Sequence, residues 1–264
     1  MLKELADGSV TSPAGYKAAG IHAGIKADPS VKDLALVYSE PKTNAAAVYT
    51  TNRVQAAPIS IDRKHLSDGR AQALIVNSGN ANACTGERGR QDAHEMCAAT
   101  ALALGLEPEQ VLVCSTGVIG VPLPMSAIAA GIPKVAAALS ESGGVDAAEA
   151  IMTTDTVPKH YAVELELGGK LVRIGGMSKG AGMIAPNMAT MIALVTTDGA
   201  IESTLLQKLL GGAVSRSFNG ITVDGDMSTN DTLIVMANGA SGVEVSQANS
   251  SEVEQFTDAF EAVC

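Results

Sequence analysis

The sequence predicts an α/β fold. Short apolar segments of strand length alternate with longer segments in which apolar or small residues recur at helical spacing, a pattern typical of α/β proteins. Glycine accounts for 27 of the 264 residues, which suits a chain with many tight turns. Aromatic residues make up only 3% and Trp is absent, so the core must consist of Ala, Val, Leu, Ile and Met. The length allows one large domain or two modest ones.

Strand-like segments in the first half of the chain are short and apolar. They are residues 34–39, 46–51, 73–76 and 111–113. Pro41 and Asn44 are turn residues between the first two, and residues 77–80 form a loop after the third. Two segments have helical spacing, residues 92–104 and 126–139. Gly105 is a C-cap for the first helix, whereas Pro133 breaks or kinks the second.

The second half begins with a predicted hairpin, because residues 161–167 and 171–174 alternate apolar and polar side chains around Gly168-Gly169. Two helical segments follow, residues 204–218 and 252–263. Ser203 is a suitable cap for the first of them. Two further short strands are residues 221–223 and 232–236. A polar loop, residues 224–231, lies between these strands, and no linker marks a domain boundary.

The chain is acidic, with a formal net charge of −10. Binding to a phosphate backbone needs clustered Lys and Arg, so a nucleic-acid partner is not expected. The composition fits a protein with a small-molecule substrate. Residues 1–10 lack the apolar core of a signal peptide, and the sequence contains no run of 18 apolar residues. We therefore expect a soluble, cytoplasmic protein with no membrane partner.

Metal and cofactor motifs are incomplete. The four cysteines lack a Cys-x-x-Cys pair and stand at Cys84, Cys97, Cys114 and Cys264. His94-Glu95 lacks the second His of a zinc-binding helix, and Pro186 directly after residues 180–185 disfavours the helix that a dinucleotide fingerprint requires. Residues 224–231 lack the central Gly and terminal Glu of a calcium loop, so a polar turn lining a cleft is favoured. No metal and no cofactor are expected.

Residues 175–191 form a glycine-rich segment that is too apolar for a surface linker. Lys179 is the only charged residue between Arg173 and Asp198. Glycines permit a close approach of the backbone or a positive φ. From composition alone, a buried glycine-rich crossover with one Lys at its mouth explains the segment, since such turns are common in α/β folds.

The same segment carries a resemblance to a known family. Residues 179–191, KGAGMIAPNMATM, resemble the self-cleavage signature of the ornithine acetyltransferase (glutamate N-acetyltransferase) family of arginine biosynthesis. Four further blocks match in the same order: residues 77–86, 115–120, 151–156, and 217–219 with its continuation to Thr232. The resemblance implies a two-domain α/β fold with mixed sheets. It also implies a chain cut into two parts that stay associated, with assembly into a heterotetramer.

The resemblance places self-cleavage between Ala189 and Thr190, which divides the sequence into residues 1–189 and 190–264. A threonine hydroxyl can attack the preceding carbonyl to give an ester that water resolves. The new α-amine then serves as the base for the same hydroxyl, because an α-amine titrates near neutrality. This chemistry needs no Ser-His pair.

The resemblance also assigns residues to the site. The donors for the tetrahedral oxyanion are the hydroxyl of Thr116 and the backbone N–H of Gly117, which follow a predicted strand. Without the resemblance, a simple Ser/Thr turn explains these two residues. Substrate binding is assigned to Thr153, Lys179 and Thr190, and Lys179 suits the α-carboxylate of an amino acid.

The implied reaction transfers an acetyl group. Thr190 takes it from N-acetylornithine, ornithine leaves, and glutamate collects it as N-acetylglutamate. Some family members also accept acetyl-CoA, and the sequence leaves this use open. Family chains continue past the position of Cys264 and supply a Glu and other residues to the substrate site. Two alternatives remain: an N-terminal-nucleophile aminopeptidase or amidase, which passes the acyl group to water, and an inactive truncated remnant.

Overall fold

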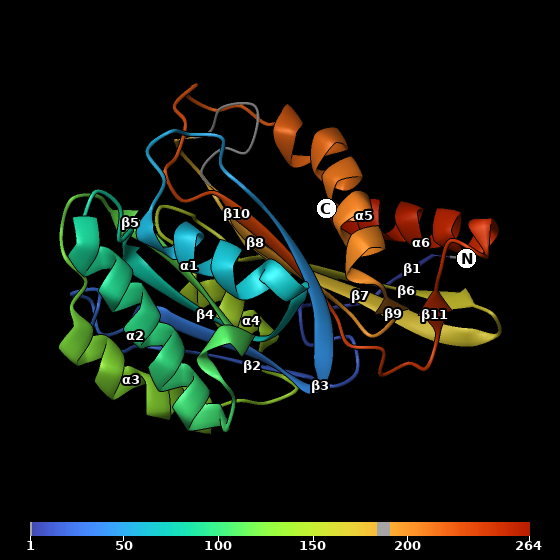
Figure 1. Cartoon of the computed structure of the whole chain (residues 1–264), viewed down its shortest axis with the longest axis horizontal. Coiled ribbons are helices and arrows are strands. Elements are labelled where there is room, and N and C mark those ends of the chain that lie inside the picture. Colours follow the sequence, from blue (N-terminus) through green and yellow to red (C-terminus); the bar gives the residue numbers. More distant parts are fainter. Residues whose placement is uncertain (1, 184–190) are drawn as a thin grey trace.

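The computed structural model describes residues 2–183 and 191–264, which fold around a mixed β-sheet (Figure 1). The described strands of this sheet are β1 (Lys3–Glu4), β2 (Tyr16–Ile21), β3 (Leu34–Tyr49), β4 (Arg70–Asn80), β5 (Val111–Val118), β6 (Lys159–Leu167), β7 (Lys170–Lys179), β8 (Ile192–Thr197) and β10 (Thr232–Ala237). Their order is β1-β6-β7-β8-β10-β3-β4-β5, with β2 paired to β3. Strands β8 and β10 pair in parallel, as do β4 and β5, and the other neighbours are antiparallel. The predicted α/β fold with a mixed sheet is confirmed.

Helices cover both faces of the sheet. In the described residues they are α1 (Ala57–His65), α2 (Gly86–Leu104), α3 (Met125–Ala137), α4 (Gly144–Ala150), α5 (Ser203–Arg216) and α6 (Ser250–Val263). Leu34 and Leu36 of β3 enter a cluster with α2 and α3, whereas Ala35 and Val37 enter a cluster with α4. Because successive side chains of a strand point to opposite faces, α4 lies on the face opposite α2 and α3.

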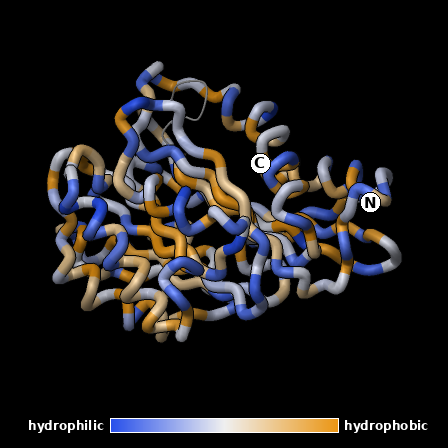
Figure 2. Tube along the Cα trace, in the orientation of Figure 1, coloured by the Kyte–Doolittle hydropathy of each residue, from blue (hydrophilic) through white to orange (hydrophobic). Residues whose placement is uncertain are grey.

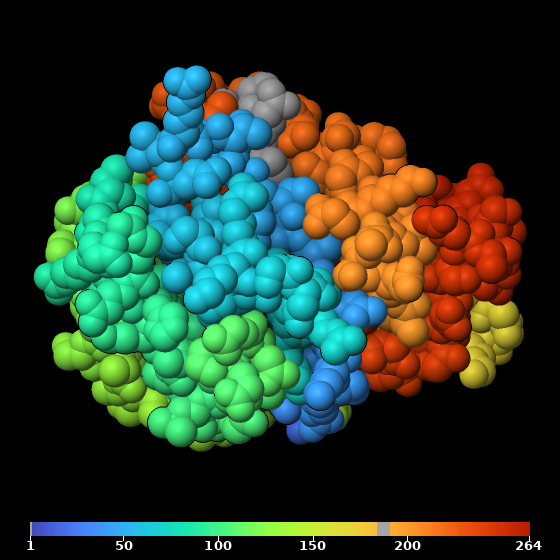
Figure 3. Space-filling view, in the orientation of Figure 1, coloured from blue at the N-terminus to red at the C-terminus, as the bar shows by residue number. Residues whose placement is uncertain are grey.

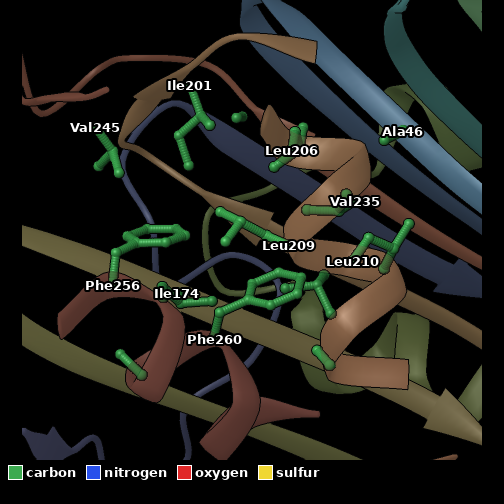
Figure 4. Close-up of a cluster of buried hydrophobic side chains, with 14 of the residues drawn as sticks. Ala46, Ile174, Ile201, Leu206, Leu209, Leu210, Val235, Val245, Phe256 and Phe260 are labelled. Atoms are coloured by element: carbon green, nitrogen blue, oxygen red, sulfur yellow. The ribbon is translucent and has the colours of Figure 1, made fainter. Parts of the chain in front are cut away.

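Helices α5 and α6 cover the other end of the sheet, beside the small parallel ribbon of β9 (Ala200–Ile201) and β11 (Glu244–Val245) (Figure 1). Their apolar side chains converge on the sheet in Figure 4: Leu206, Leu209 and Leu210 from α5, Phe256 and Phe260 from α6, and Ile174 and Val235 from the strands. The two phenylalanine rings stack with centroids 6.2 Å apart. Burial of each such side chain stabilises the fold by about 1.5–3 kcal/mol, so this cluster holds α6 on the sheet.

Strand β3 is longer than predicted. Residues 34–49 form one strand instead of two strands separated by a turn, and its pairing with β4 shifts between Tyr38 and Thr43. Pro41 lies within this irregularity, where it does not have to donate a ladder hydrogen bond. The residues that favour a turn therefore produce a bulge and leave the strand continuous.

Strands β4 and β5 also continue beyond their apolar segments. The loop predicted at residues 77–80 belongs to β4, and β5 extends to Val118. The added residues are polar but pair with one another, with Asn77 opposite Ser115 and Ser78 opposite Thr116. Buried polar residues are stable there because the parallel ladder satisfies their backbone groups.

Several local predictions are confirmed. Gly105 is the C-cap of α2 with φ 69°, a left-handed conformation that favours glycine. The hairpin of β6 and β7 turns at Gly168 and Gly169, whose φ angles are 56° and 78°. Helix α6 covers the segment predicted as helical, and the side chain of Asn249 caps it by accepting a hydrogen bond from the N–H of Glu252.

Other local predictions are wrong. Helix α3 does not break at Pro133 but continues to Ala137, because the burial of Ile132 and Val135 offsets one missing backbone hydrogen bond. Glu202 is the N-cap residue of α5, so Ser203 is the first helical residue and not the cap. Residues 221–223 follow the short 3₁₀ helix Phe218–Gly220, are exposed and do not form a strand.

Hydrophobic residues concentrate in the strands of the central sheet, as the colouring of the chain trace in Figure 2 shows. On the face drawn in Figure 3, residues of the first half of the chain cover one side and the segments after residue 200 cover the other. None of the described helices has the length and apolar character that crossing a bilayer requires.

Candidate active site

A cavity of about 590 Å³ lies at the ends of β4, β5 and β7. Four of the predicted site residues line it: Thr116, Gly117, Thr153 and Lys179. They come from three segments that are distant in sequence. Ser228, Thr229 and Asn230 also line it, which agrees with the polar turn predicted at residues 224–231.

Gly117 stands at the end of β5 in a conformation that only glycine adopts easily. Its φ is 135°, and an added Cβ would lie 2.2 Å from the carbonyl carbon of Gly79 on the neighbouring strand. The close approach of β4 and β5 at this point therefore requires a residue without a side chain. Both glycines line the cavity, so the backbone of β5 is accessible from it.

Thr116 and Lys179 are joined inside the cavity. The Nζ of Lys179 donates a hydrogen bond of 3.1 Å to the Oγ1 of Thr116. An ammonium group is only a donor, so Thr116 accepts this bond and keeps its own hydroxyl hydrogen for another acceptor. The pair is suited to bind a negatively charged group, because Lys179 keeps further N–H donors and Thr116 keeps its hydroxyl hydrogen.

Lys179 is the last residue of β7 and its side chain is buried, with 3% of the residue exposed. Burial lowers the pKa of its ammonium, against the opposing effect of the carboxylates of Asp155 and Asp231. A buried ammonium is poorly solvated, so an anionic ligand entering the cavity would interact with it strongly.

Asp155 links two sides of the cavity. Its carboxylate accepts hydrogen bonds from the N–H of Gly180 at 2.8 Å and from the N–H of Thr153 at 3.3 Å. Burial opposes ionisation, but Lys159 and these N–H groups outweigh it, and the pKa of Asp155 is lowered. Asp155 therefore holds the turn of Thr153 against the end of β7 as an anion.

Lys26 is a second cation of the cavity wall that the sequence did not single out. Its Nζ donates to the carbonyl of Met152 at 2.7 Å and to that of Lys32 at 3.1 Å. Burial lowers the pKa of Lys26, although Asp33 and Asp155 act in the opposite direction. Its contact with Met152 fixes the residue directly before Thr153.

The polar loop before β10 is tied to the strands that bear the predicted oxyanion donors. The side-chain amide of Asn230 donates to the carbonyl of Ala81 at 2.6 Å and to that of Ser115 at 2.8 Å. Asp231, the next residue, is fully buried. These contacts join residues far apart in the chain, so no local pattern indicates them.

Ala189 and Thr190, the predicted cleavage residues, lie outside the described residues. On one side, Met183 lines the cavity and its N–H donates to Asp224 at 2.6 Å. On the other side, Met191 is buried directly before β8, and its N–H donates to Asp231 at 2.8 Å. The described residues contain no cluster of three or more His, Cys, Asp or Glu side chains suited to a metal ion.

The arrangement of sheet and helices is shared with a solved structure of distant sequence. An L-aminopeptidase D-Ala-esterase/amidase from Ochrobactrum anthropi, described as a variant of the Ntn hydrolase fold, matches with a TM-score of 0.56. The match covers 97% of this chain and 84% of that one at 13% identity. At this identity the likeness shows a common fold and nothing finer.

Within that fold, the chain belongs to the ArgJ family, whose model matches residues 17–264. The arginine biosynthesis bifunctional protein ArgJ of Symbiobacterium thermophilum is 55% identical over 257 residues, which are 97% of this chain and 64% of that protein. The ArgJ protein of Caldanaerobacter subterraneus is 52% identical over 98% of this chain and 64% of its own length. The chain thus spans 64% of the length of these relatives.

Two solved structures with related sequences also match. ArgJ from Bacillus halodurans is 46% identical with a TM-score of 0.67, over 72% of this chain and 98% of that one. The ornithine acetyltransferase of Mycobacterium tuberculosis, solved in complex with ornithine, is 43% identical with a TM-score of 0.66, over 73% of this chain and 100% of that one.

Proposed function

We propose that this chain contains the nucleophile-bearing part of a self-cleaving acetyltransferase that transfers acetyl from N-acetylornithine to glutamate. The observation that carries the proposal is the cavity, which collects Thr116, Gly117, Thr153 and Lys179 from separate segments of an ArgJ-family chain. Described residues on both sides of the predicted cleavage site belong to the same region. Met183 lines the cavity, and the N–H of Met191 donates to Asp231, which directly follows the cavity residue Asn230.

Self-cleavage would create the catalytic nucleophile. The hydroxyl oxygen of Thr190 attacks the carbonyl carbon of Ala189, the C–N bond breaks, and the departing nitrogen takes up the hydroxyl proton. The product is an ester between Ala189 and Thr190. Water then hydrolyses this ester, which leaves a carboxylate on Ala189 and a free hydroxyl and α-amine on Thr190.

The extent of the matching solved chains supports a cut at this point. The Bacillus halodurans chain is matched over 98% of its length by 72% of this chain, and 72% of 264 residues is about 190. The Mycobacterium tuberculosis chain is matched over its full length by 73% of this one. Separate chains of this size are expected if the relatives are divided at a position equivalent to Ala189–Thr190.

In the transfer reaction, the α-amine of Thr190 accepts the hydroxyl proton as the oxygen attacks the acetyl carbonyl of N-acetylornithine. The hydroxyl of Thr116 and the backbone N–H of Gly117 would stabilise the oxyanion. The Lys179 bond to Thr116 orients that hydroxyl, because it occupies a lone pair and leaves the hydrogen for the substrate oxygen. Ornithine leaves with the proton, and the amine of glutamate then takes the acetyl group from Thr190.

Lys179 is the proposed partner of the carboxylate that N-acetylornithine and glutamate share. It is buried in the cavity wall, where an ion pair is less screened than on the surface. Asp155 holds the Thr153 turn beside it, which places a second polar residue against the same substrate. Acetyl-CoA as an additional donor, assembly into a heterotetramer and a cytoplasmic location are further parts of the proposal, and no cofactor is invoked.

The aminopeptidase or amidase alternative shares the fold and the chemistry of the nucleophile. Its support is a relative that is 13% identical, whereas the ArgJ protein of Symbiobacterium thermophilum is 55% identical over almost the whole chain. The acetyltransferase is therefore favoured. An inactive remnant is disfavoured because Thr116, Gly117, Thr153 and Lys179 all line the described cavity.

Denaturing mass spectrometry and product analysis test the proposal together. We expect two fragments that meet at Ala189 and Thr190, and a single uncut chain with Thr190→Ala. We also expect N-acetylglutamate to form only when N-acetylornithine and glutamate are both supplied. Release of acetate without N-acetylglutamate would establish the amidase instead, and an uncut wild-type chain would establish the remnant.

A further inference from the structure

Asp231 holds the residue that follows the proposed nucleophile. Its Oδ1 accepts a hydrogen bond of 2.8 Å from the N–H of Met191, and its side chain is fully buried. The N–H of Thr232 donates to the carbonyl of Met191 at 3.0 Å. Both peptide groups of Met191 are thus held by consecutive residues at the start of β10. These two hydrogen bonds restrain the backbone of Met191, the residue that follows Thr190 in the chain.

Asp231 is itself held in place. Its carbonyl accepts a hydrogen bond of 2.8 Å from the N–H of Thr50, at the end of β3. Its neighbour Asn230 is bonded to the carbonyl of Ser115, the residue before Thr116. Asn230 and Asp231 therefore form a short bridge from the strand of the proposed oxyanion donors to the residue next to Thr190.

The second carboxylate oxygen of Asp231 is unusual. Oδ2 is buried and makes no hydrogen bond with a described residue. The hydroxyls of Thr50 and Ser228 lie nearby, but that of Thr50 donates to the carbonyl of Ser228 instead. Burial raises the pKa of Asp231 to about 7, against the opposing effects of the Met191 N–H, these hydroxyls and the Lys179 ammonium.

We propose that Asp231 is a positioning residue for self-cleavage: it holds Met191, the residue that follows the proposed nucleophile in the chain, while its neighbour Asn230 holds the strand of the proposed oxyanion donors. The inference rests on the proposed function and extends it to a residue that does not line the cavity. Correct placement is a large part of catalysis, because a displacement of about 1 Å can cost about 100-fold in rate.

Two variants at position 231 separate the contact from the charge. Asp231→Ala removes the acceptor of the Met191 N–H, whereas Asp231→Asn keeps an acceptor of the same shape without a titratable group. Each chain is made by cell-free synthesis, transferred to buffers on either side of neutrality, and followed by denaturing mass spectrometry. We expect cleavage to slow about 100-fold with Asp231→Ala and less than about tenfold with Asp231→Asn.

The pH dependence of the cleavage rate distinguishes a positioning role from a merely structural one. Loss of a merely structural contact would not change this dependence. The uncut chain has no α-amine at Thr190, so that group does not contribute. Wild-type cleavage should accelerate as pH rises through about 7, because the ionised carboxylate binds the Met191 N–H more strongly. Asp231→Asn should lose this inflection. The Lys179 ammonium is present in both proteins, so its titration does not account for the difference.

Asp198 provides a matched control at the other end of β8. It is also a buried aspartate, and its two oxygens accept hydrogen bonds from the N–H groups of Arg173 at 2.8 Å and Ala14 at 3.0 Å. It does not line the cavity. We expect Asp198→Ala and Asp231→Ala each to lower the melting temperature, but Asp198→Ala should leave the rate of cleavage within about twofold of the wild type.

The cleavage rates of these variants decide whether Asp231 has the proposed role. If the wild type is cleaved and Asp231→Ala is cleaved equally fast, the positioning role is overturned. The same holds if Asp198→Ala slows cleavage as much as Asp231→Ala does. Both outcomes leave the proposed function intact. If Asp231→Ala does not fold, Asp231→Asn decides: an unchanged rate together with an unchanged pH profile overturns the role. Failure of the wild type to cut at Ala189–Thr190 would instead refute the proposed function.

Discussion

Replacing Asp231 with Asn should stabilise the fold at neutral pH, although the same change is expected to impair self-cleavage. The perturbation is made in a Thr190→Ala background, so both proteins remain single chains. Burial raises the pKa of Asp231 from 3.8 to about 7, which means that the folded protein holds this proton more tightly than the unfolded chain does. Asn imitates the protonated carboxyl and has no proton to lose.

The magnitude follows from the gap between the two pKa values. Stability from a raised carboxyl pKa is fully present below the unfolded pKa and is lost as pH rises to the folded pKa. A gap of about three units corresponds to about 4 kcal/mol, at roughly 1.36 kcal/mol per unit. The advantage of Asp231→Asn should therefore be near zero at about pH 4, grow up to about pH 7, and then remain constant.

Urea unfolding of the two proteins across this pH range measures the difference directly. At neutral pH the gain of about 4 kcal/mol should also raise the melting temperature by about 10 °C for a chain of this size. Asp62 and Asp198, whose pKa values are also raised by burial, occur in both proteins and cancel. A difference that does not change between acidic and neutral pH would refute the reasoning, because it would show that Asp231 ionises equally easily in the folded and unfolded states.

Three further predictions concern the cavity. Thr116→Ala removes one oxyanion donor and should lower kcat by about 100- to 1000-fold with little change in KM, as steady-state assays of acetyl transfer would show. Gly117→Ala places a Cβ 2.2 Å from the carbonyl carbon of Gly79 and should destabilise the fold by about 1–3 kcal/mol in urea titrations while also slowing cleavage. Lys179→Met removes the buried partner of the substrate carboxylate and should raise KM by about 30-fold or more, corresponding to about 2 kcal/mol, without a loss of melting temperature.

The buried apolar strands were predictable from sequence, but their ends were not. The apolar segment at residues 73–76 marks the centre of β4, where the side chains are fully buried on both faces. The strand continues through Asn77 and Ser78 because the ladder to β5 satisfies their backbone groups. Sequence patterns treat such polar residues as loop formers, and only the partner strand shows otherwise.

Elements built from small residues were missed. Strand β2 has the sequence YKAAGI, and α4 has the sequence GVDAAEA, so neither shows strong apolar periodicity. They form because they pack very closely: a Cβ at Gly20 would lie 2.0 Å from the carbonyl oxygen of Asp146. Close backbone packing of this kind depends on two segments at once, and a single sequence does not reveal it.

The candidate site was predicted through family motifs more than through chemistry. Thr116, Gly117, Thr153 and Lys179 meet in one cavity, yet each also fits an ordinary turn or crossover when considered alone. Asp155 lies inside one of the matching blocks but was not singled out. Its importance comes from the backbone N–H groups that it binds, and those partners are set by the tertiary structure.

The electrostatics in and beside the cavity indicate why a stable fold would keep charged groups that are costly to bury. Lys179 has a lowered pKa and Asp231 a raised pKa, so burial favours the neutral form of each. Apolar side chains in their place would avoid the cost of burying charged groups. Their presence is explained if Lys179 binds a substrate and Asp231 holds the backbone during self-cleavage. A substrate carboxylate would stabilise the ammonium of Lys179, and the carboxylate of Asp231 would hold the N–H of Met191. The features that reduce stability in this region are therefore the same features that the proposed chemistry requires.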